Sequence, residues 1–507
     1  MKKLSLFLLG IALLSACSSS KNGFMSEQHR PQFHFTPKTG WMNDPNGMVY
    51  FKGEYHLFYQ YYPDSTVWGP MHWGHAVSKD RIRWEHLPIG LFPDKLGYIF
   101  SGSVVVDEQN TSGFGTQKDP PLIALYTYHD MVGEKSGRTD FQSQALAFSV
   151  DKGRTWTKYA NNPVMPNQGA KDFRDPKVLW FEPSKEWIMT LAVADHTAFY
   201  TSKDLKNWSE ASEFGKNEGS HGGVWECPDL FPLTTENGST KWVLIVNIGN
   251  GAPNGGSGTQ YFIGQFDGRT FKNDNKPDDF LWLDYGRDNY AGVTWANAPD
   301  NRRVLLGWMS NWNYAQVVPT QKWRSAMTLP RELSLKTTEK GVRLVQKVIK
   351  EAEILRGAKM EILPQNISGN VDLKLKSSAK GHELSLNFDM SQTTAIDFGV
   401  ILSNSKGENV KIGYEKGVNH FYVDRAYSGK IDFEKGFTGK HYAPRLSTNK
   451  SLKMKIYIDV SSVELIADDG ETVVTDIFFP TEDFTKIALF GSNGVANLTS
   501  GQLWRLK

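Results

Sequence analysis

Short runs of alternating hydrophobic and polar residues fill this chain from about residue 31 to its end, which predicts β-strands. Residues 46–60 hold two such runs, rich in aromatic side chains and joined by a tight turn at Lys52-Gly53. Between residues 31 and 340 no long segment repeats its apolar positions with the 3.6-residue period of a helix. Glycine, proline, asparagine and aspartate interrupt the runs instead, so the pattern indicates an all-β protein.

A polar turn followed by an aromatic residue recurs along the first 340 residues. The copies are Ser78-Lys79-Asp80 before Trp84, Ser149-Val150-Asp151 before Trp156, Ser202-Lys203-Asp204 before Trp208, and the weaker Phe266-Asp267-Gly268 before Phe271. Their spacing of roughly 50 to 70 residues leaves room for four strands and their loops. Such repetition predicts a β-propeller, and counting the stretch that begins at Trp41 gives five blades. We expect these repeats to be structural, with the aspartate turning a hairpin and the ring packing between blades.

The pattern changes near residue 362. Residues 371–376, 384–388 and 452–458 alternate cleanly between Gly, Asn and Asp turns, which is typical of a β-sandwich. The stretch 336–360 is charged and rich in Lys and Glu. We therefore expect a propeller over 31–340, a linker over 341–361 and a sandwich over 362–507. The sandwich either binds carbohydrate or only stabilises the propeller, and the sequence leaves both open.

The first 17 residues have the form of a targeting segment. Lys2 and Lys3 precede an apolar run, 4–14, that is too short to span a membrane as a mature helix. The following Leu14-Ser15-Ala16-Cys17 resembles a bacterial lipobox, which predicts cleavage before Cys17 and a lipid anchor on that residue. Residues 18–30 read as a polar tether, and the predicted location is the bacterial cell envelope, on the periplasmic face or the cell surface. The alternative is an ordinary signal peptide with an incidental cysteine.

Composition excludes several classes of partner. Lys+Arg (57) nearly balances Asp+Glu (55), so no basic patch argues for nucleic acid. The two cysteines are Cys17 and Cys227, and no disulfide is possible if Cys17 carries a lipid. The 12 histidines show no pairs at zinc-ligand spacing, and we expect neither a metal nor a cofactor. The 16 tryptophans suit both a β-rich core and stacking against sugars.

Three stretches place a carboxylate beside a proline or one residue short of it. They are Trp41-Met42-Asn43-Asp44-Pro45-Asn46-Gly47, Phe173-Arg174-Asp175-Pro176 and Trp225-Glu226-Cys227-Pro228-Asp229. Proline fixes its own φ and restricts the residue before it, so Asp44 and Asp175 are held by a stiff backbone. Any one of these stretches alone could be a plain turn or a buried ion pair. Together they predict three loops that converge on one pocket.

With these three motifs the chain resembles the fructan-cleaving glycoside hydrolases of family 32, the invertases, levanases and inulinases. In that family the motifs carry, in the same order, a nucleophile, a transition-state stabiliser and an acid/base. The resemblance assigns these roles to Asp44, Asp175 and Glu226, and it also implies five blades. It implies a retaining mechanism through a covalent fructosyl-enzyme intermediate, which requires the carboxyl groups of Asp44 and Glu226 to lie roughly 5–5.5 Å apart.

The residues around each carboxyl group suggest its charge state. Amides at Asn43 and Asn46 favour a charged Asp44, as a nucleophile requires. Trp225 and Cys227 suggest an apolar shell that would raise the pKa of Glu226, as a general acid requires. Arg174 beside Asp175 is expected to keep that aspartate ionised, so that it accepts hydrogen bonds from sugar hydroxyls.

Further positions match the sugar pocket of the family one by one. The resemblance implies that Asn43, Gln60 and Arg174 bind sugar hydroxyls, that Ser101 donates a hydrogen bond, and that aromatic rings form the wall. These rings are Trp68, Phe100, Tyr285 and Trp308. For the tryptophans and Phe100 the alternative is simple packing.

Substrate and mode of action stay open. The run 255–262 is levanase-like and favours levan (β-2,6), while inulin (β-2,1), sucrose and fructosyl transfer remain possible, as do internal and terminal cutting. A sialidase fits the Ser149–Trp156 turn but not the three carboxylate motifs. An arabinan- or xylan-cleaving five-bladed enzyme also uses two Asp and one Glu. From a different class, a glycan-binding surface lipoprotein without turnover is compatible with the lipobox and the sandwich.

Overall fold

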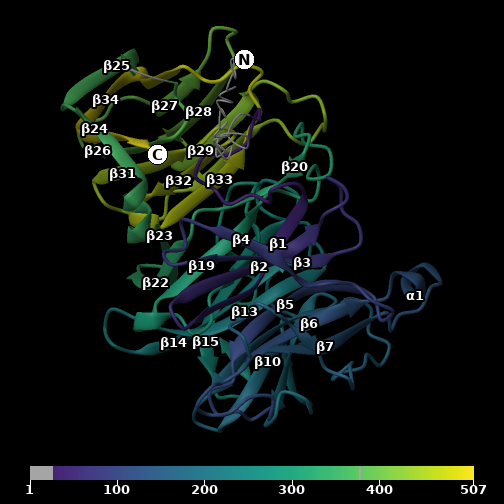
Figure 1. Cartoon of the computed structure of the whole chain (residues 1–507). Coiled ribbons are helices and arrows are strands. Elements are labelled where there is room, and N and C mark those ends of the chain that lie inside the picture. The colour runs from purple at the N-terminus through teal and green to yellow at the C-terminus, as the bar shows by residue number, and fades with distance from the viewer. Residues whose placement is uncertain (1–26, 376–377) are drawn as a thin grey trace, which may run out of the picture.

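The computed structural model describes residues 27–375 and 378–507. The predicted signal segment 1–17, with Cys17, and most of the tether 18–30 lie outside the described residues. Within the described part of the chain, no helix is both long and apolar enough to cross a membrane. The fold is all-β, as the alternating pattern predicts, and Figure 1 shows a propeller with a sandwich packed beside it.

The propeller has five blades, each built from antiparallel strands, and the first strands of neighbouring blades lie against one another around the axis. Blade 1 holds β1 (Gly40–Phe51), β2 (Glu54–Tyr62), β3 (His72–Ser78) and β4 (Glu85–Leu91); blade 2 holds β5 (Tyr98–Val106), β6 (Leu122–His129), β7 (Gln142–Ser149) and β8 (Thr157–Lys158). Blade 3 holds β9 (Phe173–Phe181), β10 (Glu186–Val193), β11 (His196–Ser202) and β12 (Ser209–Phe214). A short helix, α1 (Met131–Lys135), interrupts the connection between β6 and β7.

Blades 4 and 5 carry extra short strands. Blade 4 holds β13 (Trp225–Thr234), β14 (Thr240–Ile248), β15 (Gly258–Phe266), β16 (Phe271–Asn273) and β17 (Leu281–Trp282). Blade 5 holds β18 (Tyr290–Thr294), β19 (Arg303–Met309), β21 (Ala326–Met327), β22 (Arg331–Thr338) and β23 (Gly341–Val348), with a 3-10 turn, η1 (Pro299–Asn301). The ring closes where β20 (Trp323–Arg324) pairs with the start of β1, which joins late residues of the propeller to its first strand.

The repeated Ser-x-Asp turns join the third and fourth strands of blades 1 to 3. In blade 3 the Ser202 hydroxyl accepts the backbone N–H of Leu205, and the Trp208 indole donates to the Leu205 carbonyl at 3.1 Å. Trp84 and Trp156 make the same bond in their own blades. The repeat therefore braces a hairpin, and none of Trp84, Trp156 and Trp208 lines the pocket that holds the carboxylate motifs.

The sandwich follows from β24 (Arg356–Ile362) onward. Its other strands are β25 (Gln365–Leu373), β26 (His382–Asp389), β27 (Asp397–Ser403), β28 (Asn409–Glu415), β29 (His420–Tyr427), β30 (Lys440–Pro444), β31 (Ser451–Ile458), β32 (Ser462–Ala467), β33 (Thr472–Ile477) and β34 (Lys486–Leu506), with a 3-10 turn, η3 (Asp468–Gly470). The long strand β34 pairs with β27 through its first residues and with β26 through its last, so it passes from one sheet to the other. Leu384, Phe398 and Leu465 lie in the core between the sheets.

The segment 341–361, expected as a linker, is largely strand. It contains β23, a 3-10 turn η2 (Lys350–Leu355) and most of β24, and β23 pairs with β22 along its whole length. Leu344 and Val345 of β23 are buried, whereas its charged residues point outward. The Lys and Glu content of this stretch thus reflects the exposed side of strands, because only one side of such a strand faces the core.

Buried charges join the two domains. Arg331 of β22 is fully buried and binds Asp284 of the propeller and Glu464 of the sandwich. Glu464 also accepts from His34 Nε2 at 2.7 Å, while His34 Nδ1 lies 2.7 Å from Asp459. Burial alone would lower the pKa of His34, but the two carboxylates outweigh it and raise this pKa to about 9. The same cluster lowers the pKa of Glu464 to about 2, where the charge of Arg331 overcomes the effect of burial.

These shifts predict how stability depends on pH. The pKa of His34 rises on folding, so its stabilisation is complete below pH 6.5 and is lost as pH rises towards 9. The free energy of unfolding should fall by as much as about 3 kcal/mol over that range, since one pKa unit is worth about 1.4 kcal/mol. Glu464 stabilises above pH 4.5 and loses this effect as pH falls towards 2. Thermal unfolding measured from pH 6 to 9 tests the loss of stability attributed to His34. If the stability of the His34→Gln variant falls as steeply with pH as that of the wild type, the prediction is contradicted.

Candidate active site

A pocket of ≈ 300 Å³ opens where the inner strands of the propeller begin. Most residues that the sequence singles out line it: Asn43, Asp44, Gln60, Trp68, Phe100, Ser101, Arg174, Asp175 and Glu226. They come from β1, β2, β5, β9, β13 and the loop after β2. Four blades therefore contribute to one site, and the three carboxylate motifs converge as their repetition predicts.

Bulges in the inner strands aim the carboxylates at this pocket. The pairing of β1 with β2 shifts register between Met42 and Pro45, and that of β13 with β14 shifts between Glu226 and Asp229. Asp175 and Cys227 adopt left-handed backbone conformations, with φ of 65° and 43°. Such conformations cost about 1–2 kcal/mol per non-glycine residue and often mark functional sites. A bulge also leaves its residues out of the ladder, so a neighbouring proline loses no hydrogen bond there.

Asp44 is surrounded by hydrogen-bond donors. The Asn43 amide donates to its Oδ1 at 2.8 Å, and the Ser101 hydroxyl donates to its Oδ2 at 2.7 Å. Asn46, the other expected donor, instead binds the backbone carbonyl of Asp44. Burial and the charge of Glu226 nevertheless raise the pKa of Asp44, against the effect of the donors. The sequence alone suggested the donors but not the burial.

Asp175 lies deeper than Asp44. Its Oδ2 accepts the backbone N–H of Cys227 at 3.0 Å, and the Cys227 thiol lies 3.6 Å from Asp175 Oδ2 and 3.5 Å from Asp44 Oδ2. Burial raises the pKa of Asp175 to about 7, although Arg174 acts in the opposite direction. The expectation that Arg174 keeps this aspartate fully ionised is therefore wrong. The guanidinium Nε is 3.9 Å away and is shared with other carboxylates, so it offsets only part of the desolvation.

Glu226 does not sit in the expected apolar shell. Its carboxylate accepts from Arg174 Nη2 at 2.8 Å and from the hydroxyl of Tyr290, a residue of β18. The indole of Trp225 is fully buried and donates to the carbonyl of Ser220, while the Cys227 thiol contacts Asp44 and Asp175. Asn247 of β14 fixes this bulge, since its amide donates to the carbonyl of Cys227 at 3.0 Å. Arg174 also binds Asp172 and thus links the acidic groups of the site.

Two of the predicted wall residues lie elsewhere. Tyr285 lines a different cavity, between blades 4 and 5 and the sandwich, and its N–H binds the carbonyl of Val473. Trp308 is fully buried behind the pocket and packs against Trp41 and Trp312. Trp312, in the loop after β19, takes the place on the wall that the sequence assigned to Trp308. Trp308 lies on the strand and faces the core, whereas Trp312 lies in the following turn and places its ring at the opening of the pocket.

Several lining residues were not predicted from the sequence. They are His129, Glu134, Gln142, Asp172, Trp312 and Gln316, to which Tyr290 adds the contact with Glu226. Asp172 stands two residues before Arg174 and could have been found from its motif. The others lie in loops or far along the chain, where no local pattern marks them.

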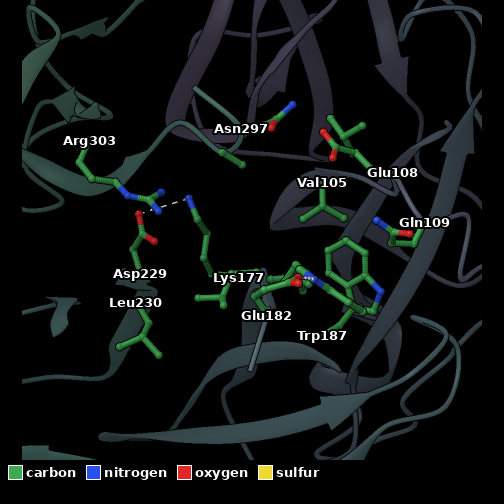
Figure 2. Close-up of a pocket in the computed structure, with 15 residues that line it drawn as sticks. Val105, Glu108, Gln109, Lys177, Glu182, Trp187, Asp229, Leu230, Asn297 and Arg303 are labelled. Carbon is green, nitrogen blue, oxygen red and sulfur yellow. Dashed lines mark hydrogen bonds and ion pairs between the residues drawn. The ribbon is translucent and has the colours of Figure 1, made fainter. Parts of the chain in front are cut away.

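A second cavity, of ≈ 320 Å³, lies further along the inner strands, beyond the carboxylates. Figure 2 shows Lys177 and Asp229 pointing toward one another there, with Arg303 close by. Asp229 also accepts from the N–H and hydroxyl of Thr294, at 2.6 and 2.8 Å. Asp229 therefore ties together β9, β13 and β18 and does not touch Glu226. The second cavity is lined by the carboxylates Glu108, Glu182 and Asp229 but by none of Asp44, Asp175 and Glu226, which all line the first, so the first is the candidate active site.

The first pocket contains the acidic side chains that a glycoside hydrolase requires. Such enzymes need one carboxylate that attacks or stabilises the reacting carbon and one carboxyl group that donates a proton. Three acidic side chains in one cavity, linked by Arg174 and Cys227, can divide these roles, because burial and repulsion between neighbouring carboxylates raise the pKa values of Asp44 and Asp175. No cluster of three or more potential metal ligands occurs in residues 27–375 and 378–507.

Comparisons with known proteins agree with this class. The family model "Glycosyl hydrolases family 32 N-terminal domain" matches residues 34–348, and "Glycosyl hydrolases family 32 C terminal" matches residues 351–505. Levanase of Bacillus subtilis (strain 168) is 49% identical over 508 residues, which cover 99% of this chain and 74% of that protein.

Solved structures show the same architecture. Exo-inulinase from Aspergillus awamori superposes with a TM-score of 0.88 at 36% identity, covering 95% of this chain and 99% of that one. β-Fructofuranosidase from Schwanniomyces occidentalis, complexed with fructosyl-erythritol, gives 0.86 at 32% identity, covering 95% and 98%. The chain belongs to glycoside hydrolase family 32 and is a β-fructofuranosidase of that family. The sialidase, arabinanase and non-catalytic alternatives are thereby set aside.

Proposed function

We propose that this β-fructofuranosidase hydrolyses fructans, with levan as its preferred polymer, and retains configuration at the reacting carbon. The observation that carries the proposal is the convergence of Asp44, Asp175 and Glu226 on one pocket. The 49% identity to a levanase favours the β-2,6 linkage. The exo-inulinase likeness keeps β-2,1 fructans as the second candidate.

In the first step the Asp44 carboxylate attacks C2 of a fructosyl unit while the bond from C2 to the leaving oxygen breaks. Glu226 gives its proton to that oxygen, and a fructosyl ester forms on Asp44. Water then attacks C2, Glu226 accepts a proton from the water, and Asp44 leaves as a carboxylate. Donors from Asn43 and Ser101 support the charged form of Asp44. Asp175 binds sugar hydroxyls, and its hydrogen bonds strengthen as positive charge develops on the ring.

Arg174 connects substrate binding with the position of Glu226. Its guanidinium binds the Glu226 carboxylate at 2.8 Å and also binds Asp172. We infer that sugar hydroxyls take over part of the Arg174 hydrogen bonding when substrate enters, which leaves the Glu226 carboxyl group free to face the leaving oxygen.

We further propose that the mature protein is held in the bacterial cell envelope by a lipid on Cys17. The lipobox-like Leu14-Ser15-Ala16-Cys17 supports this anchor. The Aspergillus awamori relative is named an extracellular exo-inulinase, which is consistent with export as a shared property. An anchored enzyme would release sugars next to the cell.

A time course of product release tests the proposed function. Purified protein is incubated with levan, inulin, sucrose and arabinan, and the product sizes are resolved. Levan should give the highest kcat/KM, and arabinan should release nothing. Fructose alone from the earliest time indicates cutting at chain ends, whereas a ladder of oligomers indicates internal cutting. Absence of release from all three fructosyl substrates would overturn the proposal.

A further inference from the structure

The pocket has a buried floor and an exposed rim. Asn43, Gln60 and Asp175 on the floor are at most 5% exposed, whereas the side chain of Glu134 on the rim is 41% exposed. If the proposed function holds, the fructosyl ring that reacts fills the floor beside Asp44. The sugar on the other side of the broken bond must then lie at the rim, on the side of the proton donor Glu226.

Glu134 is held at that rim by His129, the last residue of β6. The Gln142 amide fixes the tautomer of this histidine, because its Oε1 accepts the N–H of Phe173 at 2.8 Å. Its amide nitrogen therefore faces His129 Nδ1, at 3.2 Å, and makes Nδ1 an acceptor. The proton of the neutral ring must sit on Nε2, which lies 3.0 Å from Glu134 Oε2. Burial lowers the pKa of His129, which favours this neutral form.

The imidazole is also fixed from the side. It stacks on Phe100 with ring centroids 4.2 Å apart and an angle of 7° between the planes. Phe100 in turn meets Trp68 edge-on at 6.0 Å. His129 thus continues the aromatic wall of the pocket outward and supports Glu134 at the end of that wall.

The loop that carries Glu134 is braced as well. The Asp130 side chain caps α1 by accepting from Val132 and Gly133, and Arg138 donates to Asp130 at 3.2 Å. A bond from Asp130 N–H to the Phe141 carbonyl, at 2.7 Å, closes the base of the loop. Figure 1 shows α1 at the edge of the propeller, away from the sandwich. Within the described residues no hydrogen bond reaches Glu134 Oε1.

We propose that Glu134, positioned by His129, binds hydroxyl groups of the sugar that leaves, so that the α1 loop forms a binding site for the unit next to the broken bond. The ligand class is the polyhydroxylated leaving group of a fructan or fructo-oligosaccharide. A carboxylate forms strong, charge-assisted hydrogen bonds with hydroxyls, and a site built for such bonds discriminates against leaving groups that lack them.

The test compares two substrates in the variant Glu134→Gln. For a fructo-oligosaccharide we expect kcat/KM to fall about tenfold or more, chiefly through a higher KM, because a charge-assisted bond is weakened. For an aryl β-fructofuranoside, whose leaving group carries no sugar hydroxyls, kcat/KM should stay within about twofold. Glu210→Gln, an exposed carboxylate on the outer strand β12, is the matched control and should change neither substrate.

A second variant, His129→Phe, separates positioning from packing. The phenyl ring can keep the stack on Phe100 but cannot donate to Glu134, so the same loss on the oligosaccharide alone is expected. Equal losses on both substrates would show a merely structural role for the loop and overturn the proposal. Unchanged kinetics of Glu134→Gln on both would overturn it too. If the wild type hydrolyses no fructosyl substrate, the proposed function itself has failed, and the two failures are thus distinguished.

Discussion

Asp44→Asn should reduce kcat on every fructosyl substrate by about 10⁴-fold or more, because loss of the nucleophile removes the covalent step and leaves only binding and acid catalysis. The amide has the size of the carboxylate and can still accept from Ser101, which donates to Oδ2 in the wild type. It carries no charge with which to attack C2. The fold should survive, since removal of a carboxylate whose pKa burial has raised relieves desolvation and repulsion from Glu226.

The measurement is kcat/KM on levan and sucrose together with the thermal unfolding midpoint. Asp119→Asn is a suitable control, because this aspartate is 73% exposed and pairs only at the surface with Lys52. The control should keep wild-type rates. A residual rate in Asp44→Asn within about tenfold of the wild type would remove Asp44 from the nucleophile role.

Glu226→Ala should slow hydrolysis of fructans and sucrose by about 10²–10⁴-fold, the range expected for loss of one general acid/base. Its effect depends on the leaving group. An aryl β-fructofuranoside needs little protonation, so its first step should remain fast while the second step lacks the base that activates water. The fructosyl ester on Asp44 should then accumulate.

Intact-mass measurement of Glu226→Ala with the aryl substrate tests this expectation directly. The protein should gain the mass of one fructosyl unit, and peptide mapping should place it on Asp44. Added azide should restore turnover, because this nucleophile needs no base. Equal rate losses on fructan and aryl substrates, with no mass gain, would rule out Glu226 as the acid/base. Accumulation of the fructosyl ester on Asp44 would also support a retaining mechanism, in which the carboxyl groups of Glu226 and Asp44 lie close together.

The local sequence predicted a structural feature correctly where all of its contacts lie within one short segment of the chain. The Ser-x-Asp turns brace their own hairpins, as Ser202 and Trp208 show, so a repeat in the sequence predicts a repeat in the fold. Asp44 and its donor Asn43 are adjacent, so their contact was visible in the motif. The charged stretch before residue 361 was predicted to be a linker but is largely strand, because charged residues on the exposed side of a strand give a sequence pattern like that of a charged linker.

Electrostatics depended on contacts that no local motif contains. Asp175 was expected to be ionised by Arg174, but burial raises its pKa to about 7. Glu226 was expected in apolar surroundings, but it meets Arg174 from blade 3 and Tyr290 from blade 5. These partners are 52 and 64 residues away along the chain. Desolvation and long-range charge are properties of the assembled pocket.

The sequence by itself determined the all-β class, the turn that recurs from blade to blade, and the three motifs that carry Asp44, Asp175 and Glu226, because strand alternation, turns and proline stiffness act over a few residues. The repeat did not set the number of blades, because the stretch that begins at Trp41 and the turn at Ser78 belong to one blade. Only the tertiary structure decided that Trp312 and not Trp308 forms the wall, that Tyr285 belongs to the domain interface, and that Glu134 and His129 stand at the rim. Those outcomes depend on which side of a bulged strand faces the axis and where each loop reaches. Both are fixed by packing between blades that lie far apart in sequence.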